Sequence, residues 1–353
     1  MKKSPVLGLA PPTLYNPAMT KRILIVRTSS LGDLVHMLPA ISDIARHVPG
    51  ASIDWIVEEN FAEVPSWHPA VREVIPIAHR RWRKSWWAAS TRRERAALRR
   101  DLDARRYDIV LDMQALMKSV WLVRQTHGVR HGLDRRSARE PLASLFYDVR
   151  HTVEFWQPAV VRQRKLAASV FGYEYEGEPD FGLGRFTAAA QIQPRAVIMP
   201  SASRDDKLWP AEHWHKVFDR LTEHGLALQL LAGNERETER ARQLIAGRNA
   251  EVLPRMSLDA VATLLASGRI MVGLDSGLTH LSAGLGRPTI GIYKASTPVR
   301  TPLQGASYTA SLGERGSEPS AETVLSAVEQ ALSFEAGQSP RLAGLDDPDM
   351  VLN

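Results

Sequence analysis

The chain of 353 residues contains no cysteine, so disulfide bonds and thiolate metal sites are excluded. It also lacks any apolar run near the roughly 18 residues that a membrane-spanning helix needs. Two lysines and a short apolar patch lie in residues 1–20, but Pro11 and Pro12 interrupt the patch, which argues against a signal peptide. We therefore expect a flexible N-terminal extension over residues 1–20 and a cytoplasmic protein.

Several motifs of nucleotide and hydrolase chemistry are missing as well. There is no Walker A loop and no G-x-G-x-x-G after the first apolar run, and the absence of G-x-S-x-G argues against an α/β-hydrolase. No set of histidines or carboxylates stands out as a metal-ligand cluster, so we predict no metal site and no cofactor. A bound diphosphate would have to be neutralised by fixed protein donors.

The composition is that of a globular protein with a large core, with 44% hydrophobic and 24% charged residues. The formal net charge is +6. A basic chain favours an anionic partner, which could be a nucleotide, a nucleic acid or an acidic membrane surface.

Strand-like apolar runs alternate with helical patterns along the whole chain. These runs do not alternate polar with apolar residues, which suits parallel sheets covered on both faces. The pattern predicts an α/β protein of doubly wound parallel sheets. The expected strands are residues 22–26, 52–57, 74–78, 108–112, 196–200, 226–231, 250–254, 270–275 and 289–293.

A glycine-, proline- and acid-rich stretch without clear periodicity interrupts this pattern. We predict that it is an interdomain linker, residues 173–195, between two similar domains of residues 21–172 and 196–334 that face a central cleft. The second domain is expected to end in a helix from about Ser320 to Phe334. Residues 335–353 are expected to form a flexible tail.

Ligands of open α/β sheets bind beyond the carboxyl ends of the strands, so the loop after each strand is informative. In the loop "PSASRDDKLWP" (200–210), Ser203, Arg204 and Lys207 can donate to phosphate oxygens. The alternative is a capped helix start with solvent-facing charges.

The loop "GLDSGLTHLSAG" (273–284) is the second candidate. Gly277 would let the backbone approach a ligand, the free N–H groups of the following helix would attract an anion, and His280 could reach the same phosphate. Alternatively, Asp275 is only a helix N-cap and His280 is simply packed or exposed. After the predicted strand 226–231, Glu237 could accept hydrogen bonds from ribose hydroxyls, or be an exposed helix residue.

The segment 79–106 is very basic and carries three interleaved tryptophans, Trp82, Trp86 and Trp87. It could be a solvated helix. It could also bind anions, because arginine matches phosphate and carboxylate groups and indoles favour interfaces.

The stretch "RTSSLGD" (27–33) follows the first predicted strand and ends in Asp33, a carboxylate that would repel an anion. Asp33 could cap a helix that starts at Leu34. Pro39 lies within that helical pattern and should make its start irregular.

Five segments together resemble the lipopolysaccharide heptosyltransferase I group of glycosyltransferase family 9, which are inverting enzymes with the GT-B fold. They are "RILIVRTSSLGDLVHMLPAISD", "PSWHPAVREVIPIAHRRWRKSWW", "SAREPLASLFYD", "SRDDKLWPAEHW" and "DSGLTHLSAGLGRPTIGIY", in collinear order between about Lys21 and Phe334. The resemblance implies two Rossmann-like domains, with the acceptor in the first and the nucleotide sugar in the second. It implies ADP-heptose as donor and the inner Kdo of Kdo-lipid A as acceptor.

The resemblance also implies roles for individual residues. Asp33 would be the general base. The donor-binding set would be Ser203, Arg204, Lys207, Glu237, Met256, Asp275, Ser276, Gly277 and His280. The acceptor-binding set would be Arg80, Arg81, Arg83, Lys84, Lys118 and Arg139. The sequence departs from the family at Ala202, which lacks the hydroxyl of the usual threonine.

An inverting transfer needs a single in-line displacement, one base and stabilisation of the leaving diphosphate. The dipole and free N–H groups of the helix start would keep Asp33 ionised, so it would act late, when the acceptor proton has become acidic. We expect a metal-independent monomer in peripheral contact with the anionic inner membrane, and no nucleic-acid partner. The alternatives are a related heptosyltransferase for another core sugar and a non-catalytic nucleotide-sugar-binding protein.

Overall fold

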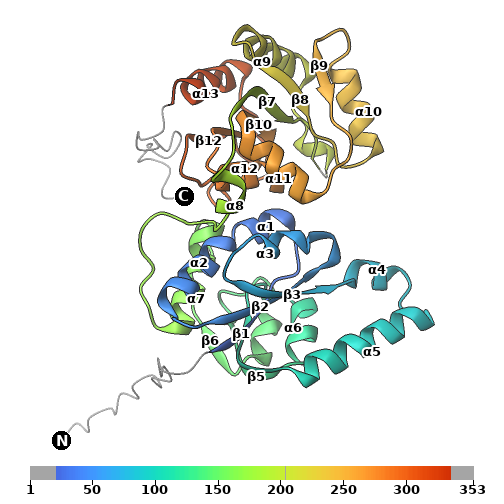
Figure 1. Cartoon of the computed structure of the whole chain (residues 1–353), viewed down its shortest axis with the longest axis vertical. Coiled ribbons are helices and arrows are strands. Elements are labelled where there is room, and N and C mark those ends of the chain that lie inside the picture. The colour runs from blue at the N-terminus through green and yellow to red at the C-terminus, as the bar shows by residue number, and fades with distance from the viewer. Residues whose placement is uncertain (1–20, 203, 335–353) are drawn as a thin grey trace, which may run out of the picture.

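The computed structural model describes residues 21–202 and 204–334 (Figure 1). The predicted extension (1–20), the predicted tail (335–353) and Ser203 lie outside the described residues. Figure 1 shows two α/β domains stacked along the long axis. Helices α1, α2 and α3 of the first domain face helices α8, α11 and α12 of the second.

The first sheet is parallel and has the order β3-β2-β1-β4-β5-β6. Because β2 and β4 lie on opposite sides of β1, the strand order reverses at β1, and the loop after β1 opens into the crevice where α/β sheets bind ligands. That loop, residues 27–30, leads directly into α1, which carries Asp33. The strands are β1 (Arg22–Val26), β2 (Ser52–Glu58), β3 (Val71–Ile77), β4 (Arg106–Asp112), β5 (His127–Leu133) and β6 (Val149–His151).

The second sheet is also parallel, in the order β12-β11-β10-β7-β8-β9. Its reversal lies between β7 and β10, so the loops after these two strands flank the second crevice. They are the two loops with candidate donor residues. The strands are β7 (Gln193–Met199), β8 (Ala227–Leu230), β9 (Ala250–Val252), β10 (Gly268–Leu274), β11 (Thr289–Ile292) and β12 (Thr309–Leu312).

Helices connect the strands and cover both faces of each sheet (Figure 1). Within residues 21–202 and 204–334, no helix combines the length and apolar character that crossing a bilayer requires. The α-helices are α1 (Leu31–Val35), α2 (Leu38–His47), α3 (Glu63–Ser66), α4 (His79–Lys84), α5 (Ala89–Ala104), α6 (Met117–Val123), α7 (Ala159–Phe171), α8 (Gly184–Thr187), α9 (Ala211–Glu223), α10 (Glu235–Leu244), α11 (Leu258–Ser267), α12 (Gly277–Gly284) and α13 (Ala321–Ser333).

The predicted α/β class and doubly wound parallel sheets are confirmed, while β5, β6 and β12 went unpredicted. β5 and β6 lie at one edge of their sheet and contain exposed histidine and arginine, and β12 is a short edge strand of small residues. Edge strands do not need the continuous apolar run that marks a central strand. The division into residues 21–172, 173–195 and 196–334 stays a prediction.

The start of the first helical region differs from the prediction of a helix from Leu34. The helix begins at Leu31, and the region breaks into α1 and α2, with Pro39 in the first turn of α2. Proline lacks an N–H group and its ring clashes with the preceding turn, so it fits a helix start and not a helix interior. The expected irregularity is confirmed, and its effect is to give Asp33 a short helix of its own.

The two domains meet where α1 lies against α12, through two glycines. A Cβ atom added to Gly277 would lie 2.7 Å from both the Gly32 nitrogen and Leu31 Cγ, closer than real Cβ contacts. Buried Leu34 of α1 and Leu281 of α12 belong to the same apolar cluster, which spans both domains. The start of the proposed donor helix is thus held directly against the helix that carries Asp33.

Hydrogen bonds between α11 and the α3 region form a second contact between the two domains. The backbone N–H of Asp259 in α11 donates to Glu63 Oε2 of α3 at 2.6 Å, and Trp67 Nε1 donates to Asp259 Oδ1 at 3.2 Å. These hydrogen bonds join partly buried groups of different domains, where water competes less for them.

Two buried histidines pack together at the contact between α1 and α12. The ring centroids of His36 and His280 are 4.3 Å apart in an edge-to-face arrangement, and both side chains are 5% exposed. Neither ring nitrogen of His36 has a hydrogen-bond partner among the described residues. Burial and the neighbouring His280 lower the pKa of His36 to about 3; Arg27 lowers it further, whereas Asp33 and Asp275 oppose the shift. His36 is therefore neutral in the folded protein at neutral pH.

This neutral histidine predicts a specific loss of stability in acid. Between the folded pKa near 3 and the unfolded value near 6.5, the unfolded chain binds more protons, so the free energy of unfolding falls as the pH drops below 6.5. The variant His36→Leu should make this dependence shallower by about 1 kcal/mol per pH unit, measured by urea unfolding between pH 7.5 and 5. His127→Gln, at an exposed histidine of β5, should keep the wild-type slope. An unchanged slope in His36→Leu would remove His36 from the acid response.

Candidate active site

The loop after β1 holds the Asp33 carboxylate in a defined position. Oδ2 of Asp33 accepts hydrogen bonds from the N–H and Oγ–H groups of Ser30, both at 2.9 Å, and Oδ1 lies 2.7 Å from Nη2 of Arg27. The Asp33 side chain still exposes 40% of its surface, whereas Arg27 exposes 11%. The carboxylate is thus anchored by its chain neighbours and accessible from one side.

The hypothesis that Asp33 is the N-cap residue was wrong, because Ser30 occupies that position and Asp33 is the third residue of α1. Its side chain does complete a capping box with Ser30. Partial burial raises the pKa of Asp33, but Arg27 and the hydrogen bonds from Ser30 lower it more, to about 2. Asp33 is therefore ionised at neutral pH, as the sequence predicted, although Arg27 contributes most to this and was missed.

Arg27 is itself held in place, because its Nη1 group donates to the carbonyl oxygen of Met113, just after β4. A basic residue directly after a strand at the sheet's reversal point was visible in the sequence. Its role was not visible, because it depends on which strand lies beside β1.

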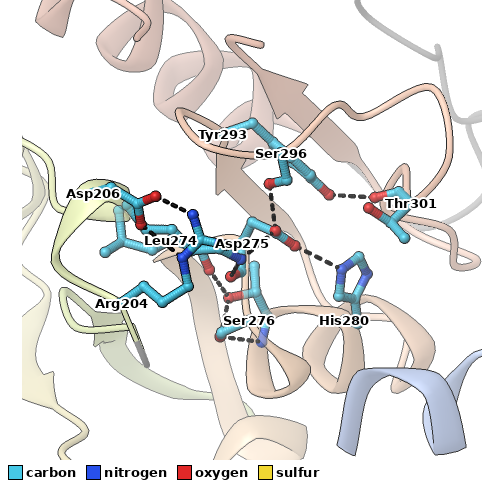
Figure 2. Close-up of polar contacts among 11 residues, drawn as sticks. Arg204, Asp206, Leu274, Asp275, Ser276, His280, Tyr293, Ser296 and Thr301 are labelled. Atoms are coloured by element: carbon cyan, nitrogen blue, oxygen red, sulfur yellow. Dashed lines mark hydrogen bonds and ion pairs between the residues drawn. The ribbon is translucent and has the colours of Figure 1, made fainter. Parts of the chain in front are cut away.

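The second crevice contains a cluster centred on Asp275, at the end of β10 (Figure 2). Asp275 Oδ2 lies 2.7 Å from Lys207 Nζ and accepts a hydrogen bond from Ser296 Oγ–H, and Asp275 Oδ1 lies 3.2 Å from His280 Nε2. Burial raises the pKa of Asp275, but His280 and Lys207 outweigh burial and hold the pKa well below its usual range. The ionised Asp275 therefore positions Lys207 and His280 at the N-terminus of α12.

The N-terminus of α12 has features that suit the binding of a diphosphate. Ser276 is its N-cap and accepts a hydrogen bond from the Thr279 N–H at 3.4 Å, so the alternative that Asp275 caps this helix was wrong. The first-turn N–H groups, including that of Gly277, precede the helical hydrogen-bond ladder and carry the positive end of the helix dipole. Together with Lys207 they can neutralise a diphosphate.

The other predicted donor residues lie outside this cluster, and two of them bind neighbouring residues. Arg204 is exposed and paired with Asp206 (Figure 2). Glu237 accepts hydrogen bonds from the Gly233 N–H at 2.8 Å and from Asn234 Nδ2 at 2.7 Å. Met256 is partly buried in the loop before α11. A ligand contact of Arg204 or Glu237 would have to compete with these partners.

Three of the predicted acceptor residues are linked to Asp33 by electrostatic interactions, directly or through one neighbour. Lys118 Nζ donates to Ser29 Oγ at 2.9 Å, and Lys118 interacts electrostatically with both Asp33 and Arg80. The Arg80 guanidinium lies over the Phe61 ring, 5.1 Å from its centroid. Arg139 interacts electrostatically with Arg300, which in turn interacts with Asp33.

The other three predicted acceptor residues are also on α4. Arg81 is paired with Glu59 at 3.1 Å and with Glu94 at 3.0 Å, and Arg83 and Lys84 are exposed on α4. Successive helix residues are rotated by about 100°, so neighbours in "HRRWRK" face different surroundings.

Two features of the sequence proved to be structural. Trp82, one of the three interleaved tryptophans, is buried in the core at 3% exposure, whereas Trp87 is 82% exposed. His127 and His131 have the H-x-x-x-H spacing of a helical metal site, but both lie on β5, and they contact Asp103 and His151, respectively. On an extended strand, two residues four positions apart are too far from each other to bind one metal ion. The spacing of His127 and His131 therefore does not indicate a metal site.

Comparisons with known proteins agree with this arrangement. The sequence model of glycosyltransferase family 9 (heptosyltransferase) matches residues 95–328. The chain is 46% identical over 283 residues to lipopolysaccharide heptosyltransferase 1 of Escherichia coli K12, covering 78% of this chain and 89% of that protein. The solved structures of the E. coli heptosyltransferase WaaC with ADP and with ADP-2-deoxy-2-fluoro heptose match with TM-scores of 0.82 and 0.79. Each is 42% identical and covers 88% of this chain and 99% of the other. The chain therefore belongs to glycosyltransferase family 9, the heptosyltransferases.

Proposed function

We propose that this protein transfers L-glycero-D-manno-heptose from ADP-heptose to the inner Kdo of Kdo-lipid A, with inversion and without a metal ion. The observation that carries the proposal is the contact between α1 and α12, which sets the ionised Asp33 of one domain against a cationic helix start in the other. The similarity to E. coli heptosyltransferase 1, and to WaaC solved with ADP and with a fluorinated ADP-heptose, supports this donor.

In the proposed reaction the acceptor hydroxyl oxygen bonds to the anomeric carbon as the bond from that carbon to the diphosphate oxygen breaks. The hydroxyl proton passes to Asp33, and the bond's electrons leave with ADP. Lys207 and the first-turn N–H groups of α12 stabilise the growing negative charge, because they are fixed before the reaction begins.

The low pKa of Asp33 shapes the timing of this step. A carboxylate with a pKa of about 2 is a weak base, so it accepts the proton only after the new bond has made the hydroxyl strongly acidic. Arg27 holds the carboxylate in position throughout. We infer that Asp33 mainly orients the hydroxyl and stabilises its developing positive charge.

The acceptor half of the site matches an acidic sugar on a lipid. Lys118 interacts electrostatically with Asp33, Arg80 with Lys118 and Arg139 with Arg300, and all three cations can bind carboxylate or phosphate groups. We propose peripheral attachment to the cytoplasmic face of the anionic inner membrane, supported by the net charge of +6 and the exposed Trp87. We also propose that the protein acts as a monomer without nucleic acid.

The direct test is heptose transfer by the wild-type protein from ADP-heptose to Kdo-lipid A, with and without EDTA. We expect equal rates in both. Transfer only to an acceptor that already carries heptose would favour a related heptosyltransferase for another core sugar, and ADP binding without transfer to any acceptor would favour a non-catalytic binding protein. Loss of activity in EDTA would contradict a diphosphate site made only of protein groups.

Lys207 should matter for binding of the nucleotide. The variant Lys207→Met removes the cation beside Asp275 and leaves that carboxylate to repel the diphosphate, so the Kd for ADP should rise about 10- to 100-fold by calorimetry, or about 1.4–2.8 kcal/mol. Lys216→Met, at an exposed lysine of α9, should bind ADP like the wild type. Wild-type affinity in Lys207→Met would place the diphosphate elsewhere.

The pH dependence follows from the low pKa of Asp33. Because the carboxylate is ionised at every pH above about 4, kcat/KM for the acceptor should show no acid limb from Asp33 between pH 5 and 8. An acceptor stripped of phosphates should be used, since phosphate monoesters titrate near pH 6. An acid limb that is present in the wild type and absent in Asp33→Asn would contradict the assigned ionisation.

A further inference from the structure

A loop of the second domain crosses onto the first domain beside the proposed acceptor site. The Arg300 carbonyl oxygen accepts a hydrogen bond from the Ala159 N–H at 2.8 Å, at the start of α7. The Arg300 guanidinium lies 4.1 Å from the Phe155 ring centroid and 5.7 Å from that of Trp156. Tyr293 Oη donates to the Thr301 carbonyl oxygen at 2.6 Å and so ties the loop to the end of β11 (Figure 2).

A second arginine, from the first domain, shares the same aromatic ring. The guanidinium of Arg162 in α7 lies 5.1 Å from the Phe155 centroid. Its Nε and Nη2 groups donate to the carbonyl oxygens of Glu154 at 3.1 Å and of Ser137 at 2.9 Å. These acceptors are uncharged, so they orient Arg162 without neutralising it.

The two guanidinium groups lack a carboxylate partner. Among the described residues, neither Arg162 nor Arg300 forms an ion pair, and Nε of Arg300 is buried without a hydrogen-bond partner. Burial, Arg300 and Arg27 together lower the pKa of Arg162 to about 10. Like charges held together in partly buried positions are unfavourable unless an anion joins them.

Electrostatic interactions connect the pair with the proposed base and its ion-pair partner. Arg300 interacts electrostatically with Asp33 and Arg139, and Arg162 interacts with Arg27, the ion-pair partner of Asp33. These interactions favour one molecule that places an anionic group between Arg162 and Arg300 and a hydroxyl group at Asp33.

We propose that Arg162 and Arg300 form an anion subsite that spans both domains and binds a carboxylate or phosphate of the acceptor. The inference rests on the proposed function and extends acceptor recognition to the second domain, where none of the predicted acceptor residues lies. Because one arginine comes from each domain, the bound anion also stabilises the contact between the two domains.

The test compares steady-state kinetics of the wild type and Arg300→Gln. The acceptor KM of Arg300→Gln should rise about 10- to 100-fold, while the Kd for ADP stays within twofold, which also reports that the second domain is folded. Arg315→Gln, at an exposed arginine of the same domain, is the matched control and should keep both values. Arg300→Lys, which retains the charge, should lie between the wild type and Arg300→Gln, and it replaces Arg300→Gln if the latter does not fold.

Two further measurements define the ligand group. Arg162→Gln combined with Arg300→Gln should raise the acceptor KM by less than the product of the single effects, because both arginines bind one anion. Acceptors with the Kdo carboxyl esterified, or with the lipid phosphates removed, identify the group. The sensitivity to Arg300→Gln should vanish for one of these acceptors.

Three outcomes would overturn the subsite: an acceptor KM of Arg300→Gln within twofold of wild type, multiplicative effects of the two substitutions, or equal sensitivity to Arg300→Gln for all three acceptors. Failure of the proposed function looks different, because the wild type would then not transfer heptose to Kdo-lipid A at all.

Discussion

The close contact between α1 and α12, through Gly32 and Gly277, is the constraint on which the rest of the site depends. A side chain at Gly277 would clash with Leu31 and the Gly32 backbone, so only glycine lets the two helix starts meet. One start carries the Asp33 carboxylate. The other carries first-turn N–H groups and follows Asp275, which binds Lys207 and the buried His280. The proposed base and the proposed leaving-group site are thus joined across a domain boundary.

In this crevice the carboxylates Asp33 and Asp275 each have a cationic partner, whereas several cations have no anionic partner among the described residues. Asp33 is paired with Arg27, and Asp275 with Lys207 and His280. Arg162 and Arg300 have no such partner among residues 21–202 and 204–334. The excess of cations matches the proposed substrates, which are anionic: a nucleoside diphosphate sugar and an acidic glycolipid. Neutral His36 fills the contact without adding charge.

Much of this arrangement could be predicted from the sequence, because Asp33, Lys207 and Asp275 each follow a strand whose carboxyl end must face the crevice. Arg27, Arg162, Arg300 and His36 could not be assigned, since their roles depend on which strands pair and how the domains meet. Arg80 and Arg81 show the same limit: adjacent in the sequence, one faces Phe61 near the site and the other pairs with Glu59 and Glu94. Periodicity fixes a helix, but its rotation depends on packing.

The central claim is that the Asp33 carboxylate takes part in the chemistry and does not only cap α1. Single-turnover heptose transfer by Asp33→Asn and Ser30→Ala tests this most directly, because the Asn amide oxygen can still accept the Ser30 hydrogen bonds but cannot take a proton. The account predicts that Asp33→Asn slows the reaction about 10²- to 10⁴-fold with ADP binding intact, and that Ser30→Ala slows it less than tenfold. A rate for Asp33→Asn within threefold of wild type, or an equal loss in Ser30→Ala, would contradict it.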